Sequence, residues 1–172
     1  MNWFNTKQEF SSEKTSLKQI PAGFNIVDKY FGWQPNTVNL DIGGGKYDLM
    51  TEKLLERSVT NLIFDPYNRS YKHNEDVLLE ALLGANTVTI FNVLNVVKEK
   101  ELQLDILNLA NKTLLVGGRV FVRSTYMNPK KVSGVTKSGT FQHYLTQKEY
   151  LIIIKEVFPN AILKNGIISA IK

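Results

Sequence analysis

Short apolar runs alternate along this chain with longer segments in which apolar residues recur every three or four positions. The short runs are typical of buried strands, and the three-to-four spacing is typical of amphipathic helices. The pattern predicts strands at 37–42, 60–65, 87–92 and 119–123, and helices between them at 47–57, 74–83 and 99–111. Strands joined through a helix form right-handed parallel units. We therefore expect an α/β fold with a mostly parallel twisted sheet and helices on both faces.

Glycine and proline are expected to set several element boundaries. A first helix should begin near Pro21, because apolar residues recur at helical spacing from there until Gly32 interrupts the pattern. Gly117 and Gly118 are expected to close the helix at 99–111 and to lead into the strand that follows.

The C-terminal segment carries two further signals. Thr146, followed three residues later by Glu149, forms a capping-box pattern that predicts a helix at 146–157. An Asn-Gly pair separates the apolar runs 161–163 and 167–171, which predicts a closing antiparallel hairpin.

The chain has 172 residues, the size of one domain, and 43% of them are apolar, which is enough for one core. Residues 1–14 are polar and lack periodicity, so we expect a mobile N-terminal arm there and one folded domain over 15–172. A long polar loop is expected at 124–145, and loops of that length usually carry function.

Composition excludes several kinds of chemistry. The chain has no cysteine, which rules out disulfides, thiol nucleophiles and thiolate metal sites, and its two histidines argue against a histidine-rich metal centre. No apolar run approaches the roughly 18 residues needed to cross a bilayer, and no secretory leader is visible, so we expect a cytoplasmic protein. The net charge of +5 allows a weak attraction to nucleic acid, although many small proteins are equally basic.

Three consecutive glycines, Gly43, Gly44 and Gly45, follow the first predicted strand. A glycine turn between a strand and a helix lets the backbone approach a ligand closely, although a simple tight turn would look the same. Asp65 closes the next strand, where an acidic side chain can accept both hydroxyl hydrogen bonds of a ribose. Together they predict a site for a nucleoside-type cofactor.

The segment Asp41-Ile42-Gly43-Gly44-Gly45 resembles the first motif of the class I S-adenosylmethionine (SAM) methyltransferases, and the likeness extends over residues 15–172. The resemblance implies a Rossmann-like domain that binds SAM and releases S-adenosylhomocysteine. It places the turn against the methionine part of SAM, Asp41 at its amino group and Asp65 at its ribose. A dinucleotide site is disfavoured, because Asp48 stands where its fingerprint has a third glycine.

A narrower likeness is to small methyltransferases encoded by phages and restriction-linked loci. The shared phrases resemble Lys14-Thr15-Ser16, Asp41 to Asp48, Asp65-Pro66-Tyr67-Asn68 and Gly139-Thr140-Phe141-Gln142. Pro66 and Tyr67 thereby join the expected cofactor site. The chain departs from the wider family in two respects: Tyr47 replaces the frequent third glycine, and no distinct strand can be placed between 65 and 87, which suggests a trimmed sheet.

The reacting groups are less clearly marked. Asn92 ends the fourth strand by the family's count, so it would lie nearest the transferred methyl group, although a residue that only forms the turn after a strand would occupy the same position. His143 could act as a general base or could be a plain surface residue. Methyl transfer needs mainly alignment, so the sequence predicts a methyltransferase for an unidentified acceptor, with a non-catalytic SAM-binding or interaction protein as the alternative.

The loop at 123–144 mixes basic and aromatic residues on the side where an acceptor would lie. Such a mixture can hold phosphates and stack bases, which makes nucleic acid a candidate partner, although a solvated lysine-rich loop has the same composition. The residues concerned are Arg123, Tyr126, Lys130, Lys131, Lys137, Phe141, Gln142, His143 and Tyr144.

Overall fold

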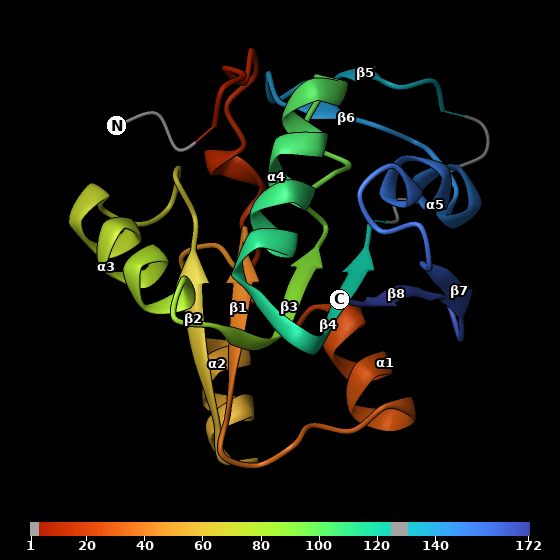
Figure 1. Cartoon of the computed structure of the whole chain (residues 1–172). Helices are drawn as coiled ribbons and strands as arrows, with labels where there is room; N and C mark the ends of the chain where they lie inside the picture. Colours follow the sequence, from red (N-terminus) through yellow and green to blue (C-terminus); the bar gives the residue numbers. More distant parts are fainter. Residues whose placement is uncertain (1–3, 125–130) are drawn as a thin grey trace.

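The computed structural model describes residues 4–124 and 131–172. One sheet of six strands has the order β2-β1-β3-β4-β8-β7, and a separate two-stranded ladder joins β5 to β6 (Figure 1). The first four strands of the sheet are parallel, β8 is antiparallel to β4, and β7 is antiparallel to β8. The strands are β1 (Thr37–Ile42), β2 (Val59–Phe64), β3 (Ala85–Phe91), β4 (Leu114–Arg123), β5 (Gly134–Val135), β6 (Phe141–Gln142), β7 (Ile162–Lys164) and β8 (Ile167–Ile171). The predicted α/β fold with a mostly parallel sheet is confirmed.

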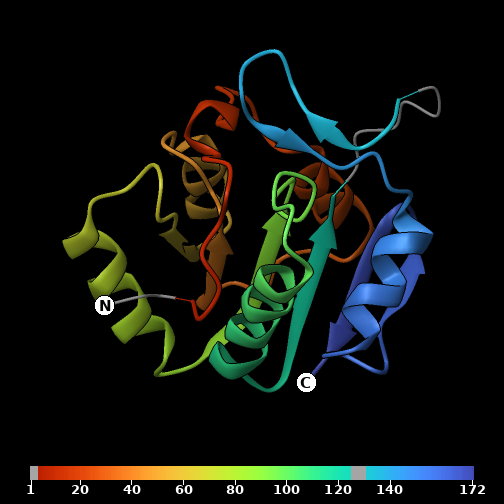
Figure 2. The same ribbon diagram turned by 90° about the horizontal axis from the view of Figure 1, so that it is seen from above.

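Helices cover both faces of the sheet (Figure 2). The helices are α1 (Ala22–Tyr30), α2 (Leu49–Leu55), α3 (Tyr71–Ala81), α4 (Lys100–Thr113) and α5 (Gln147–Lys155), preceded by a 3₁₀ turn at Glu13–Thr15. Alternate strand residues point to opposite faces, so Ile90 of β3 packs into the core beneath α3, α4 and α5, while Phe91 packs into the core beneath α1 and α2. Within the described ranges no helix has the length and apolar character needed to cross a membrane.

The local signals near the C-terminus predicted the structure correctly. The Thr146 hydroxyl accepts a hydrogen bond from the Glu149 N–H, and the Glu149 carboxylate accepts one from the Thr146 N–H at 2.7 Å, which completes the capping box of α5. Asn165 and Gly166 both have positive φ, at 53° and 76°, as the tight turn between β7 and β8 requires.

The predicted role of Gly117 and Gly118 is wrong. Helix α4 runs to Thr113 and β4 begins at the next residue, so both glycines lie inside the strand. The register between β3 and β4 shifts at this point, and Gly117 takes the positive φ of 82° that such a bulge needs. A Cβ on Gly118 would lie 2.9 Å from the carbonyl oxygen of Leu115. A glycine pair fits a bulge and a helix end equally well in sequence, which explains the error.

The sheet is short on the β2 side, as the sequence suggested. Residues 65–84 are all described and contain α3 but no strand, so β2 is the edge strand. The N-terminal arm runs between α3 and α4 (Figure 2). Phe4 packs edge-on against Phe64 of β2, and the backbone N–H groups of Asn5 and Thr6 donate to the Asp105 carboxylate of α4, each at 3.1 Å. The mobility of the arm stays a prediction.

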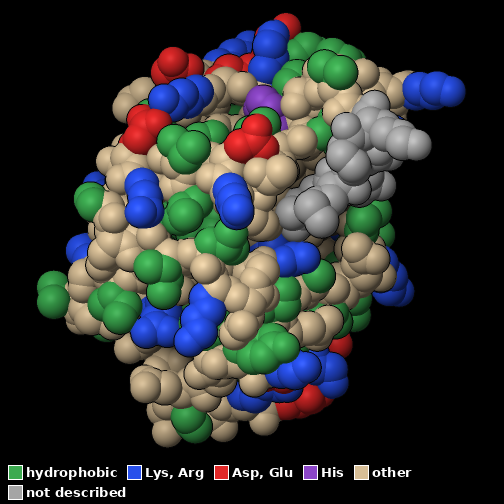
Figure 3. Space-filling view, turned by 90° about the vertical axis from the view of Figure 1, so that its right-hand side faces the viewer, with side chains coloured by type: hydrophobic (Ala, Val, Ile, Leu, Met, Phe, Trp, Pro, Cys, Tyr) green, Lys and Arg blue, Asp and Glu red, His purple; other side chains and the backbone are tan. Residues whose placement is uncertain are grey.

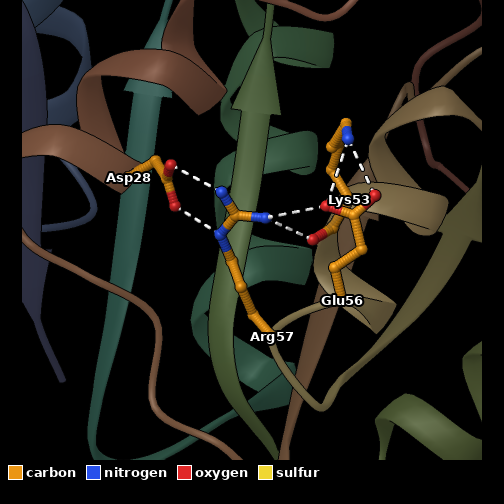
Figure 4. Close-up of polar contacts among 4 residues, drawn as sticks. All are labelled: Asp28, Lys53, Glu56 and Arg57. Carbon is orange, nitrogen blue, oxygen red and sulfur yellow. Dashed lines mark hydrogen bonds and ion pairs between the residues drawn. The ribbon is translucent and has the colours of Figure 1, made fainter.

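An ion-pair cluster joins α1 to the end of α2 (Figure 4). The Arg57 guanidinium donates two hydrogen bonds to the Asp28 carboxylate of α1, at 2.5 and 2.7 Å, and lies 5.2 Å from the centre of the Phe24 ring. Lys53 and Glu56 form a more exposed pair beside it. Arg57 therefore holds together the two helices that cover this face of the sheet.

Candidate functional site

A cavity of about 810 Å³ opens where the four parallel strands end. It is bounded by the N-terminal arm, the glycine turn and the segments that follow β2 and β3. The following eight residues predicted for the cofactor site all line it: Asp41, Gly43, Gly44, Gly45, Asp65, Pro66, Tyr67 and Asn92. Parallel strands place their carboxyl ends at one edge of a sheet, which brings these distant segments together.

The glycine turn presents bare backbone to the cavity. Gly43 and Gly45 have φ values of 74° and 75°, which favour glycine. Gly44 is constrained by space instead, since a Cβ there would lie 2.4 Å from Oδ2 of Asp41 and 2.9 Å from the Ile63 side chain. The turn therefore needs glycine at all three positions, and it leaves a surface that a ligand can approach closely.

Asp41 lies beneath the turn at the end of β1, with only 4% of its surface exposed. The Thr89 hydroxyl donates to Oδ1 of Asp41 at 2.9 Å, and it accepts in turn from the Asn39 side-chain amide at 3.0 Å. Burial raises the pKa of Asp41 to about 7, the Thr89 hydrogen bond opposes this shift, and the nearby Asp65 adds to it. Within the described chain Asp41 forms no ion pair. A cation in the cavity would favour the ionised form of this carboxyl group, which about half of the molecules hold near pH 7.

Asp65 follows β2 and is tied to the glycine turn. Its carboxylate accepts hydrogen bonds from the backbone N–H groups of Gly45 at 2.9 Å, Tyr67 at 2.9 Å and Asn68 at 3.0 Å. The Asn68 side-chain amide also donates to both carboxylate oxygens at 3.2 Å. The backbone contacts fix the carboxylate, and the longer Asn68 side-chain contacts are those that hydroxyl groups of a ligand could replace.

Arg69 anchors the far end of the glycine turn. Its guanidinium donates to the carbonyl oxygen of Gly45 at 2.9 Å and forms an ion pair with Asp48 at 2.7 Å. The Ser16 hydroxyl of the N-terminal segment accepts from the Lys46 N–H at 3.1 Å, so this segment closes one side of the cavity. Asp48, which argued against a dinucleotide, thus helps to hold the turn.

Asn92 follows β3 in a left-handed conformation, with φ of 59°. Asparagine is one of the few residues that tolerate this conformation. Its backbone N–H donates to the carbonyl oxygen of Arg123 at 2.7 Å, while the residue itself is exposed on the cavity wall. Asn92 therefore fits the turn role, and its position also fits contact with a ligand.

The structure separates His143 from the other predicted residues. The cavity lining includes Gln142 but not His143. The His143 ring is half-buried against Phe141, with ring centres 4.7 Å apart, and burial lowers its pKa. The backbone N–H of His143 donates to the carbonyl oxygen of Asn95 at 2.7 Å, which ties this loop to the segment after β3.

Two supporting residues were missed by sequence reasoning. Gln103 is 2% exposed, and its amide donates to the carbonyl oxygens of Leu94 and Val97, each at 2.9 Å, so it fixes the loop that follows β3. Arg69, described above, has the same function for the glycine turn. A buried glutamine on the inner face of a helix is a weak signal, but it could have indicated that a nearby backbone needs hydrogen-bond donors.

The basic and aromatic loop is only partly described, because Tyr126 and Lys130 lie outside the described residues. Lys131 lies 5.6 Å from the centre of the Tyr144 ring, and Phe141 stacks on Phe10. Lys and Arg side chains are scattered over the face seen in Figure 3 and do not gather into one patch there. Nucleic-acid binding by this loop stays a prediction.

No protein-family model matches the sequence, and no curated protein matches it. Solved structures do match. The 1,6-didemethyltoxoflavin-N1-methyltransferase of Burkholderia thailandensis, solved with 1,6-didemethyltoxoflavin and S-adenosylhomocysteine bound, has a TM-score of 0.65 at 12% identity over 87% of this chain and 76% of that one. A SAM-dependent methyltransferase of Methanosarcina mazei has a TM-score of 0.62 at 14% identity over 91% of this chain and 99% of that one.

Human N-acetylserotonin methyltransferase in complex with SAM has a TM-score of 0.62 at 16% identity, and the match covers 88% of this chain but 52% of the human one. At such identities the likeness defines the fold. The chain has the Rossmann-like fold of SAM-dependent methyltransferases, with the parallel sheet and the antiparallel C-terminal hairpin that the sequence predicted.

Proposed function

We propose that this protein is a SAM-dependent methyltransferase that transfers a methyl group to an unidentified acceptor and releases S-adenosylhomocysteine. One observation carries the proposal: a bare glycine turn, a buried carboxyl group beneath it and a second carboxylate beyond it converge on one cavity at the carboxyl ends of the strands. Structural neighbours solved with SAM or S-adenosylhomocysteine support it.

The residues of the cavity fit this cofactor chemically. Asp41, buried without an ion-pair partner, suits the amino group of the methionine part, and Asp65 suits the ribose hydroxyl groups. The three glycines of the turn line the cavity directly. Pro66 and Tyr67 extend the wall beyond Asp65, and Asn92 borders the cavity at the next strand end. When bound, SAM supplies a methyl group on a positively charged sulfur.

We further propose that the acceptor is a small molecule with an N–H or O–H group. The cavity volume of about 810 Å³ lies towards the upper end of the roughly 300–1,000 Å³ typical of small-molecule sites. Asn95 lines the cavity with 4% of its surface exposed, and its buried Oδ1 accepts no hydrogen bond within the described chain, so a turn of this amide towards the cavity would let it accept one from a donor on the ligand. Several neighbours are N- or O-methyltransferases by name.

Calorimetric titration with SAM and with S-adenosylhomocysteine tests the cofactor site. Saturable binding is expected for the wild type, and Asp65→Asn should weaken it by roughly ten- to a hundredfold, because a charge-assisted hydrogen bond contributes about 1.5–3 kcal/mol. Asp76→Asn is the matched control: it removes an exposed carboxylate that pairs with Lys72 on α3 and does not line the cavity, so it should change affinity less than about twofold. If the folded wild type binds neither compound, the proposal is wrong.

Turnover distinguishes an enzyme from the non-catalytic alternative. Release of S-adenosylhomocysteine would be followed with panels of small amines and alcohols, with mixed oligonucleotides as a separate arm. Methyltransferase activity would be supported if the wild type released S-adenosylhomocysteine only in the presence of an acceptor and a variant that cannot bind SAM did not. Saturable SAM binding without release in any arm would favour a SAM-binding protein. The likeness to phage-encoded methyltransferases stays a prediction from the sequence.

A further inference from the structure

Arg123 stands at the end of β4, on the wall of the cavity and beside Asn92. The chain has four arginines, and three of them have evident partners. Arg57 pairs with Asp28, Arg69 pairs with Asp48, and Arg119 lies over the rings of Phe31 and Phe121. Arg123 alone among them has neither a carboxylate nor a ring as partner within the described ranges.

The surroundings of Arg123 leave its charge uncompensated. Burial alone lowers the pKa of its guanidinium, with no neighbouring carboxylate acting in the opposite direction. Within the described part of the chain, its one side-chain hydrogen bond is from Nη1 to the carbonyl oxygen of Gly166, in the turn between β7 and β8. A guanidinium has five N–H donors, so most of them are left for another group. A partly buried guanidinium with free N–H donors is well suited to bind an anion.

We propose that Arg123 binds an anionic group, a carboxylate or a phosphate, on the methyl acceptor; this inference rests on the proposed methyltransferase function. A guanidinium matches such groups with paired hydrogen bonds, which would set the orientation of the acceptor. The site would therefore select small acceptors with an acidic group over neutral ones of the same shape.

The sheet order argues that the anion belongs to the acceptor and not to SAM. Asp41, the partner proposed for the amino group of SAM, lies on β1, two strands away from β4, a separation of about 10 Å. The Arg123 side chain reaches further still, towards the hairpin turn at Gly166. The carboxylate of SAM is attached to the same carbon atom as its amino group, so it would lie near β1. Asp41 and Asp65 thus lie at the ends of β1 and β2 and Arg123 lies at the end of β4, while the other described lysine or arginine that lines the cavity, Lys7, belongs to the N-terminal arm.

Nitrogen-15 NMR of the arginine Nε–H signals tests this directly, in the ligand-free protein and in the protein saturated with S-adenosylhomocysteine. The probes are acetate and inorganic phosphate, with acetamide as the neutral match for acetate. We expect the Arg123 signal to shift saturably with at least one anion in both states and not with acetamide. Arg123→Lys should retain weaker anion binding, detected from neighbouring amide signals, and Arg123→Gln should lose it.

Arg119→Gln is the matched control, because Arg119 lies on the same strand, packs on rings and does not line the cavity. It should leave the Arg123 response intact. Absence of any saturable shift at Arg123 would overturn the proposal. A shift abolished by S-adenosylhomocysteine, or a tenfold loss of SAM affinity in Arg123→Gln, would assign Arg123 to the cofactor and overturn the acceptor assignment. The titration of the ligand-free protein with acetate or phosphate does not involve SAM. It can therefore succeed or fail independently of the methyltransferase proposal.

Discussion

If the cavity binds SAM as proposed, Asp41 should make the affinity depend on pH by an amount that follows from its pKa. Its pKa is raised to about 7 because the carboxyl group is buried beneath the glycine turn. Asp65 contributes to the raised value, while the Thr89 hydroxyl and the charge of Arg69 oppose it. A positively charged amino group binds to the ionised carboxylate, so the protonated fraction of the free protein must lose its proton on binding.

The magnitude follows from this proton. About one unit below the pKa, near pH 6, roughly nine-tenths of the free protein is protonated, so the affinity should be about tenfold lower than near pH 8, a difference of about 1.4 kcal/mol. Close to one proton should be released per SAM bound near pH 6, and almost none near pH 8. Calorimetry in buffers of different ionisation enthalpy measures this release.

The control is Asp41→Asn, which removes the titratable carboxyl group of the protein but leaves the protonation of SAM itself unchanged. Its affinity should be lower than that of the wild type near pH 8, and the pH dependence that belongs to the protein should disappear. The reasoning would be refuted by wild-type affinity that is flat between about pH 6 and pH 8, or by proton release identical in the two proteins.

The same group should affect stability with a definite sign. Because the pKa of Asp41 in the folded protein lies above its ordinary value of 3.8, its contribution to the free energy of unfolding is full below 3.8 and is lost as pH rises through about 7. In the absence of ligand, Asp41→Asn should therefore melt at a higher temperature than the wild type at alkaline pH. A residue that weakens the ligand-free fold and improves binding is expected at a functional site.

Three further substitutions, the second with a matched control, test how the site and its supports are built. Gly44→Ala places a Cβ 2.4 Å from the Asp41 carboxylate, so it should lower the free energy of unfolding by about 1–3 kcal/mol, measured by chemical denaturation. The same variant should also lose SAM binding, measured by calorimetry. Arg57→Ala removes the ion pair with Asp28 and the contact with the Phe24 ring, so it should lower the free energy of unfolding by about 1–2 kcal/mol. Its control, Lys53→Ala, removes a more exposed ion pair and should lower it by under about 0.5 kcal/mol. Equal losses in the two variants would contradict the role given to Arg57. Thr146→Ala removes the capping box of α5 and should cost about 1 kcal/mol in the same denaturation assay, with SAM affinity unchanged.

The candidate site is easiest to anticipate from the sequence where two strand ends determine it. Gly45 and Asp65 are 20 residues apart in the chain, yet their contact follows from the parallel βαβ pattern, which places both at the carboxyl edge of the sheet. The hairpin at Asn165 and Gly166 and the capping box of α5 were predictable because their signals are local. The glycine pair at 117 and 118 was misread because the bulge depends on pairing with another strand.

The contacts that support the site could not be predicted in the same way. Gln103, Arg69 and Asn68 act through carbonyl oxygens or carboxylates of other segments, and those partners are defined only once the chain has folded. His143 could not be placed from the sequence either: histidine is suited to acid–base catalysis, but this ring packs on Phe141 and does not line the cavity. The contrast between Arg123 and the other arginines likewise appears only when all their neighbours are known.

A crystal structure with S-adenosylhomocysteine is the most direct test of the cofactor site. We predict that the ligand lies along the glycine turn, with its amino group beside Asp41. Its ribose hydroxyl groups should bind the Asp65 carboxylate in place of the Asn68 side chain, and its own carboxylate should not contact Arg123. A ligand bound elsewhere, or a cavity that stays empty at saturating concentration while the protein is folded, would contradict the account.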